Sequence, residues 1–314
     1  MGVARTGLGY ACVLAAAAVS TCVMAAAPAR SAPNAACREV ERRFDLIRSE
    51  ITSVQLNAVL FQVADRGCEP LARALLAAGA AVEARDRLGT MPLSYAARSG
   101  HLALVELILE KGAPINARNL SGSTALYLAA ENDRLAVVQR LLTRGADPKL
   151  SGRGDVTPIA AAAFKGNDRV VEVLLAHGVD ANAVDKTGKA PILYAAALGF
   201  TPVVQRLLDS GVDVNARYGN DLTVLMWAAG YAENAGALDA EAVVKLVLDR
   251  GGDIDAVDNR GRSALMTAAE LGHAGIVEIL LARGASRTLR DKQGKSALDL
   301  AADQALRDRL VAKQ

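Results

Sequence analysis

The residues best suited to chemistry in this chain of 314 residues are three histidines and four cysteines. Histidine serves as a general base or metal ligand, and cysteine as a nucleophile or ligand. None of His101, His177 and His273 stands with a serine or cysteine in a spacing typical of nucleophilic catalysis. No glycine-rich phosphate loop or carboxylate pair stands out either. We therefore expect no catalytic residue and no cofactor.

The N-terminal segment has the pattern of an export signal. Arg5 supplies a positive charge, residues 6–29 carry none, and small residues such as Ala25–Ala27 then offer A-x-A cleavage sites. These features predict a signal peptide over residues 1–32. Two alternatives stay open, namely an uncleaved membrane anchor and a lipid anchor at Cys22.

Cleavage would leave Cys37 and Cys68, an even pair in a chain bound for an oxidising compartment. We expect them to form a disulfide that ties the N-terminal segment to the first repeat, although two buried free thiols are an alternative. Both cysteines are far from any histidine in sequence, which offers too few ligands for a metal site.

The charge balance argues against nucleic acid as a partner. Residues 1–32 contain two of the 36 basic residues and no acidic ones, so 34 basic and 34 acidic residues remain after cleavage. Binding to a phosphate backbone is driven by an excess of Lys and Arg. A mature chain with a formal charge of zero lacks that excess.

The elements that position these residues follow from an internal repeat. Glycines recur at spacings of 33, 33, 33, 33, 40 and 33 residues, and paired alanines keep the same phase. The glycines are Gly79, Gly112, Gly145, Gly178, Gly211, Gly251 and Gly284, and the alanine pairs run from Ala96-Ala97 to Ala301-Ala302. Repeats of this length indicate stacked supersecondary units that bury their apolar faces against their neighbours.

One unit illustrates the local prediction. Thr157-Pro158 is typical of a helix start, and Ile159, Ala162 and Ala163 then share one face. Gly166-Asn167-Asp168 is expected to break this helix and cap a second one. Each unit is therefore a helix–turn–helix, with helices too short to be stable in isolation.

These motifs resemble the ankyrin-repeat family. Thr157-Pro158-Ile159 and Met91-Pro92-Leu93 resemble its T-P-L-H-x-A core, and Gly211–Ala216 resembles its G-A-D-V-N-A turn. The resemblance implies an all-α solenoid with β-hairpin-like turns. Its repeats are 53–85, 86–118, 119–151, 152–184, 185–217, 218–257 and 258–290, followed by a partial cap at 291–314. Residues 33–52 are expected to form an N-terminal capping helix.

The resemblance also explains the histidines and implies a binding face. His101 and His273 occupy the register position at which the family normally has a histidine between its helices, and His177 follows a second helix. In the family, residues after the alanine pair and at the turn tips line a concave binding face. The candidate partner-binding residues are Arg98, Glu131, Phe164, Lys165, Tyr194, Leu198, Trp227 and Tyr231.

Within this set the middle repeats present Phe164, Leu198 and Tyr231 with polar residues around them, the anatomy of a protein interface. Tyr194 and Trp227 either extend this patch or lie half-buried between first helices. A seven-residue insertion in repeat 218–257 is expected to form a loop before Asp239 caps the next helix. Arg153-Gly154-Asp155 matches an integrin-type tripeptide, which we interpret as a chance string in a turn.

These observations predict a non-catalytic protein-binding scaffold, monomeric and located in the periplasm or outside the cell. The alanine-rich signal is typical of bacteria. The partner is a protein, with no small-molecule substrate and no stable membrane insertion after cleavage. An alternative is a secreted effector that binds host or competitor proteins, and a third is an enzyme with an unrecognised site.

Overall fold

The computed structural model describes residues 35–48, 50–230 and 237–311. The proposed signal peptide and its two alternatives lie outside these residues. The described residues form seventeen α-helices, two short 3-10 helices and no strands, apart from two isolated β-bridges, which confirms the all-α fold class. Among them, no helix has the length and apolar character needed to cross a membrane.

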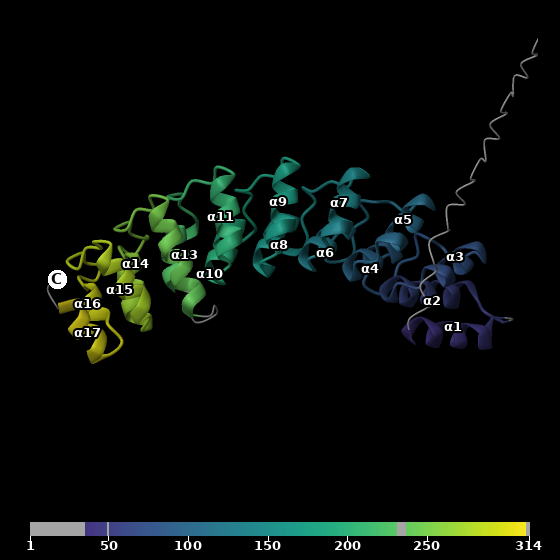
Figure 1. Cartoon of the computed structure of the whole chain (residues 1–314), viewed down its shortest axis with the longest axis horizontal. Helices are drawn as coiled ribbons and strands as arrows, with labels where there is room; N and C mark the ends of the chain where they lie inside the picture. The colour runs from purple at the N-terminus through teal and green to yellow at the C-terminus, as the bar shows by residue number, and fades with distance from the viewer. Residues whose placement is uncertain (1–34, 49, 231–236, 312–314) are drawn as a thin grey trace, which may run out of the picture. The chain divides into compact units, whose positions relative to one another are not determined.

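The helices pair into repeating units that stack side by side (Figure 1). The first helices of the units are α2 Ser53–Arg66, α4 Pro92–Ser99, α6 Ala125–Glu131, α8 Pro158–Lys165, α10 Pro191–Ala197, α12 Val224–Gly230, α14 Ala264–Leu271 and α16 Ala297–Leu300. The second helices are α3 Glu69–Ala77, α5 Leu102–Glu110, α7 Leu135–Thr143, α9 Asp168–Ala176, α11 Thr201–Asp209, α13 Ala237–Asp249, α15 Ala274–Ala282 and α17 Gln304–Val311.

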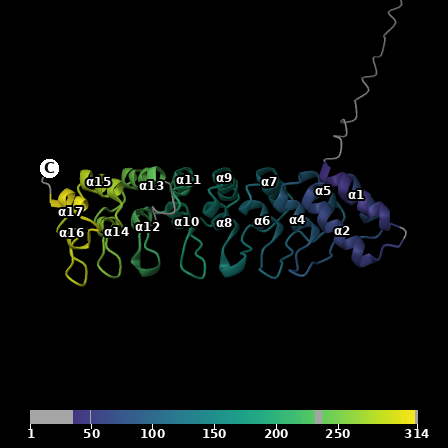
Figure 2. The same ribbon diagram turned by 90° about the horizontal axis from the view of Figure 1, so that it is seen from below.

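Each kind of helix forms its own row. From α2 to α16 each first helix contacts the next, and from α3 to α15 each second helix contacts the next. Figure 2 shows the two rows, with long loops projecting from the row of first helices. The exposed side chains of that row and its loops are called here the first-helix face.

Local signals in the sequence account for the helix ends. The Thr157 hydroxyl accepts a hydrogen bond from the Ala160 N–H at 3.3 Å, and Pro158 occupies the first turn of α8. Gly166 adopts the left-handed conformation that ends this helix (φ 75°). Asn167 occupies the N-cap position of α9, as Gly166-Asn167-Asp168 predicted, but its side chain makes no cap bond. Its amide instead donates to the carbonyls of Ala130 and Glu131 in the preceding unit, at 2.8 and 3.2 Å.

Small side chains allow the first helices to pack closely. The alanine pairs of α4 to α14 are buried, with at most 1% exposure. A bulkier side chain at these positions would push adjacent helices apart, since buried interfaces have little free volume. The last pair differs, because α16 ends at Leu300 and Ala302 is exposed.

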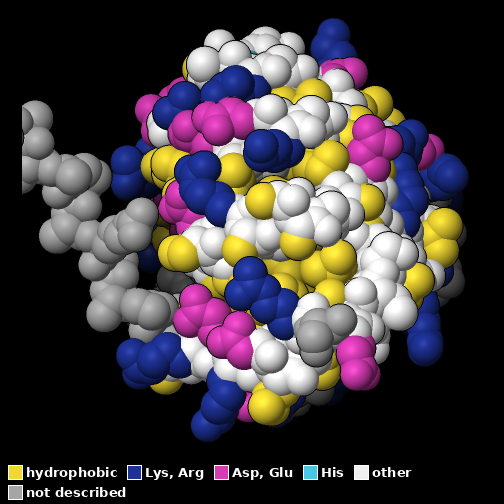
Figure 3. All heavy atoms as spheres, turned by 90° about the vertical axis from the view of Figure 1, so that its right-hand side faces the viewer, with side chains coloured by type: hydrophobic (Ala, Val, Ile, Leu, Met, Phe, Trp, Pro, Cys, Tyr) yellow, Lys and Arg dark blue, Asp and Glu magenta, His cyan; other side chains and the backbone are white. Residues whose placement is uncertain are grey.

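The ends of the array carry their own covers. Helix α1 (Ala35–Ile47) packs on α2 through Cys37, Val40 and Phe44, and a disulfide joins Cys37 to Cys68, as expected from the sequence. Figure 3, which views the α1–α3 end, shows charged side chains of both signs among apolar ones. At the other end α17 buries Leu306 and Leu310.

Ion pairs join successive second helices along the array. Arg140 on α7 contacts Glu106 on α5 at 3.0 Å, and Arg206 on α11 contacts Asp168 on α9 at 2.9 Å. These pairs are partly exposed, and exposed ion pairs contribute about 0–1 kcal/mol each. Apolar packing therefore holds the units together, and the ion pairs add to their alignment.

Seven five-residue tips connect the units on the first-helix face, at 86–90, 119–123, 152–156, 185–189, 218–222, 258–262 and 291–295. Five of them begin with an Asp or Asn whose side chain accepts hydrogen bonds from the N–H groups two and four residues later. Tips 152–156 and 218–222 begin with Gly152 and Tyr218, so they lack this acceptor. Both instead contain two successive residues with positive φ.

Candidate functional site

The three histidine rings contact backbone carbonyls. His101 Nε2 lies 3.0 Å from the Asp65 carbonyl, and His273 Nδ1 lies 2.8 Å from the Ala229 carbonyl. Each of these two rings therefore links its unit to the preceding first helix, at the register position that Asn167 occupies in α8–α9. His177 contacts the Val173 carbonyl within its own helix, at 2.8 Å. Among the described residues no cluster of His, Cys, Asp and Glu could hold a metal ion.

Three aromatic side chains form a row across consecutive units. Phe164 on α8, Tyr194 on α10 and Trp227 on α12 come from neighbouring first helices. The rings of Phe164 and Tyr194 meet edge to face, with centroids 5.7 Å apart. Lys189, from tip 185–189, places its Nζ 5.8 Å from the Tyr194 ring and 5.5 Å from the Trp227 ring. Lys165 Nζ lies 5.4 Å from the Phe164 ring.

We call Phe164, Tyr194, Trp227, Lys165 and Lys189 the aromatic–lysine row. Phe164 is 46% exposed, whereas Tyr194 and Trp227 are half-buried. Stacking of a cation over aromatic rings is worth about 0.5–1 kcal/mol at exposed sites, so these contacts favour positions of both lysines near the rings. The row therefore combines apolar surface with two oriented positive charges, which suits a protein partner.

A buried carboxylate holds the centre of the row. The Tyr194 hydroxyl donates a hydrogen bond to Asp185, whose other oxygen accepts from the N–H groups of Thr187 and Lys189 at 2.7 and 3.1 Å. Burial works against the charge of Asp185, but these hydrogen bonds outweigh it and lower the pKa of the carboxyl. Burial and the bond to Asp185 raise the pKa of Tyr194. Asp185 therefore positions both the Tyr194 ring and the backbone of Lys189.

A tyrosine–aspartate hydrogen bond of the same kind recurs near the N-terminus. The Tyr95 hydroxyl donates to Asp86 at 2.6 Å, which together with burial raises the pKa of Tyr95 to about 12. Arg98 lies over the Tyr95 ring at 5.0 Å and is paired with Asp65 at 2.8 Å. The positive charge beside the Tyr95 ring, that of Arg98, is therefore already paired with the Asp65 carboxylate.

The remaining candidate residues do not belong to the aromatic–lysine row. Glu131 and Leu198 are half-buried, at the ends of α6 and α10. Tyr231 and residues 232–236 of the insertion lie outside the described residues. Asp239 does not cap the next helix, because α13 begins at Ala237, before it. Arg153 to Asp155 form a 3-10 turn at a tip, in which Asp155 pairs with Lys186 at 3.8 Å.

Lys189 is the residue that sequence reasoning missed. It belongs to the tip that precedes α10, five residues before Tyr194 and 38 before Trp227 in the chain. The periodic spacing could have placed it at the base of a tip, but not between two rings of different units.

A groove opens beside the row, between tips 185–189 and 218–222. It has a volume of about 320 Å³ and is lined by Thr187, Gly188, Lys189, Leu193, Gly219, Asn220, Leu222 and Trp227. At four other junctions an N–H of the later tip bonds the carbonyl at the third position of the earlier tip, as from Leu120 to Leu88 at 2.9 Å. Within the described part of the chain, no such bond joins Gly219 to Thr187.

Side chains do not close this junction either. Arg118 and Arg217 each donate to a carbonyl at the base of the following tip, at 2.8 Å in both cases. Val184 occupies the equivalent position before tip 185–189 and has no donor. The junction between tips 185–189 and 218–222 therefore lacks both the backbone bond and the arginine bond.

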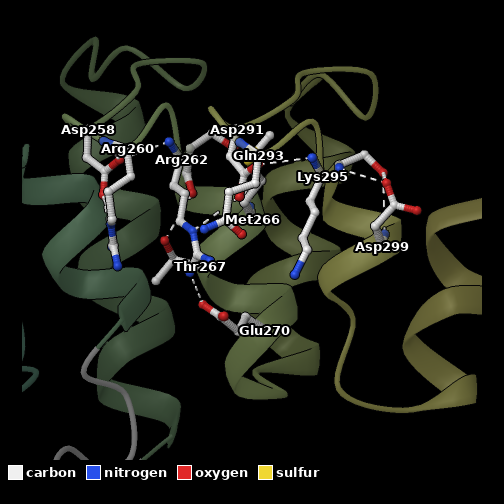
Figure 4. A network of polar contacts seen from close by, with 12 residues as sticks. Asp258, Arg260, Arg262, Met266, Thr267, Glu270, Asp291, Gln293, Lys295 and Asp299 are labelled. Atoms are coloured by element: carbon white, nitrogen blue, oxygen red, sulfur yellow. Dashed lines mark hydrogen bonds and ion pairs between the residues drawn. The ribbon is translucent and has the colours of Figure 1, made fainter.

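The last units carry a network of ion pairs on the first-helix face. Figure 4 shows a network in which Arg262 contacts Glu270 and Asp291, and Arg260 contacts Asp258 at 2.9 Å. The carboxyl of Asp291 accepts from the N–H groups of Gln293 and Lys295, which lowers its pKa. The arginines of this network pair with carboxylates, in contrast to the lysines of the aromatic–lysine row.

Comparison with known proteins agrees with the repeat architecture. A family model described as ankyrin repeats (3 copies) matches residues 60–152 and 158–239, and one described as ankyrin repeats (many copies) matches residues 239–301. No curated protein matches the chain. The matched residues run from within α2 to Ala301 except for residues 153–157, and the chain belongs to the ankyrin-repeat family.

Proposed function

We propose that this protein is a non-catalytic scaffold in the periplasm or outside the cell, and that it binds a protein partner through the first-helix face and the tips. Ankyrin repeats imply a protein–protein interaction scaffold. The observation that carries the proposal is the aromatic–lysine row, where an exposed phenylalanine adjoins two half-buried rings and two lysines.

The composition of this row supports protein binding. Aromatic anchors surrounded by polar groups dominate the energetics of protein interfaces. The row also crosses three units, so a partner there contacts a surface held by several inter-unit contacts. Fold alone would not name a binding site, since function depends on the side chains displayed on it.

The proposed location is supported by two features. The N-terminal 32 residues have the pattern of an export signal. The disulfide between Cys37 and Cys68 suits an oxidising compartment, because thiols are kept reduced in the cytosol.

A pull-down tests the proposal. Residues 33–314, with the disulfide intact, are used as bait in periplasmic extract, beside Phe164→Ala/Trp227→Ala and the matched control Leu88→Ala/Leu120→Ala. The control leucines are exposed at distant tips, by 65% and 79%. We expect wild type and control to capture the same protein and the row variant to lose it, with all three of equal helicity by circular dichroism.

The remaining outcomes contradict specific parts of the proposal. Capture by both variants would exclude the aromatic–lysine row as the binding face. Loss in the leucine variant alone would place binding at the N-terminal tips. Absence of capture from periplasmic extract, with capture from culture medium or cytosol, would contradict the periplasmic location.

A further inference from the structure

We propose that the groove between tips 185–189 and 218–222 binds an extended segment of the protein partner that carries an acidic side chain and an apolar one two residues apart. The inference rests on the proposed function and assigns the chemistry of the partner at that face. It depends on three features of the groove, namely its charge, its backbone groups and its tryptophan.

The charge of the groove is positive. Lys189 is the only ionisable residue among those that line it. In the described part of the chain, its ammonium has no carboxylate within ion-pair distance. Of the nearby acids, Asp185 is buried under its own hydrogen bonds and Asp155 is paired with Lys186. Asp221 is exposed on the neighbouring tip but does not line the groove.

The ammonium is also oriented. The Lys189 ammonium lies near the rings of both Tyr194 and Trp227, and the Lys189 backbone N–H donates to Asp185. A carboxylate from a partner would meet a cation already in place. Charge-assisted hydrogen bonds of this kind are about twice as strong as neutral ones.

The backbone groups favour an extended segment. The Gly219 N–H and the Thr187 carbonyl stand at the positions that bond one another at four other junctions, and here they are not joined. A Cβ built on Gly219 would lie 3.7 Å from that carbonyl, so the backbones of the two tips lie close together without this bond. An extended chain presents both donors and acceptors to such a pair, as in the addition of a strand to a sheet edge.

Spacing sets the arrangement of the two partner side chains. In an extended chain, residues two apart lie on the same face, about 6.5 Å from one another. Lys189 Nζ and the centre of the Trp227 ring are 5.5 Å apart. An acidic residue at one position and a Leu, Ile or Phe two residues along therefore reach the lysine and the indole together.

The test uses a display library of random 12-residue peptides, selected on the disulfide-bonded chain 33–314. Trp227 is the only tryptophan in the chain. Its fluorescence therefore reports directly on the groove when Trp-free selected peptides are titrated. We expect enriched peptides to carry Asp or Glu two residues from an apolar residue, and to change the Trp227 emission on binding.

Matched substitutions then test the contact itself. Lys189→Met keeps the length of the stem over the rings but removes the charge, and should weaken binding of a selected peptide about tenfold. Replacing the acidic residue of the peptide by its amide should weaken binding to the wild-type protein by about the same factor. The same replacement should change the affinity for the Lys189→Met protein only slightly, because the lysine it would contact is absent. The control is Lys295→Met, the same tip position in the last unit, where binding should be unchanged.

The inference fails separately from the proposed function. Enriched peptides without an acid, unchanged Trp227 emission, or equal binding to Lys189→Met would each overturn it. Failure to enrich any peptide would also overturn recognition of a short extended segment. In all these cases, capture of a folded partner that depends on Phe164 and Trp227 would leave the scaffold proposal standing.

Discussion

The hydrogen bond from Tyr194 to Asp185 provides a quantitative test of how the aromatic–lysine row is held. Asp185 is only 8% exposed, and the Tyr194 hydroxyl donates to one of its carboxylate oxygens. Tyr194→Phe keeps the ring but removes this donor from a buried charge. A hydrogen bond to a charged group contributes about 1.5–3 kcal/mol. We therefore expect the free energy of unfolding at pH 7 to fall by about that amount.

The effect has a defined pH dependence. Hydrogen bonds lower the pKa of Asp185 in the folded protein relative to the unfolded chain, where it is about 3.9. A group with a lowered folded pKa contributes stability that is fully present above the unfolded pKa and is lost as pH falls through the folded one. The difference between wild type and Tyr194→Phe should therefore be constant from about pH 5 to pH 7 and shrink below about pH 4.

Urea unfolding followed by circular dichroism at pH 7 and pH 3 measures this difference. Tyr127→Phe is the matched control, because the tip before that ring begins with Asn119 in place of an aspartate. Its hydroxyl has no carboxylate at the equivalent site, so we expect little change. Equal stability of the two variants at pH 7, or a Tyr194→Phe deficit of the same size at pH 3, would refute the reasoning.

Three further substitutions probe the array itself. Cys37→Ser with Cys68→Ser removes a link across 31 residues, for which the chain-entropy model gives about 3–4 kcal/mol; faster hydrogen exchange in α1 would show it, and unchanged exchange would contradict it. Asn167→Ala leaves two partly buried carbonyls without their donor and should cost about 1–3 kcal/mol in urea unfolding. Ala163→Leu inserts three carbons where exposure is 0% and should destabilise the protein by about 1–3 kcal/mol, whereas Lys165→Leu on the exposed side of α8 should not.

The repeat explains why the sequence predicted so much of the fold. A spacing of 33 residues places equivalent side chains in equivalent environments, so one unit read from Thr157 to Gly178 describes the others. Helix starts at Thr or Ser followed by Pro or Ala, and ends at Gly, are local signals that need no tertiary information. The disulfide was predictable because only two cysteines follow residue 32.

The errors arose where a side chain acts between units. Asn167 has the composition of a helix cap, yet its amide reaches two carbonyls 36 and 37 residues earlier. Those carbonyls lie at the end of α6, where no helical N–H follows to satisfy them, so the long-range bonds take precedence over the local one. Asp239 fails for a different reason, since α13 begins before it and spans the end of the insertion.

The groove was visible in the sequence only as an irregularity. Five tips begin with Asp or Asn, whereas the other two begin with Gly152 and Tyr218. Each altered tip lacks the side-chain acceptor that organises the others, and each fails to bond the tip before it. Arg118 compensates at the first of these junctions, while Val184 cannot at the second. The junction beside Trp227 therefore lacks both kinds of bond between its tips, and its candidacy as a site depends on the aromatic–lysine row that borders it.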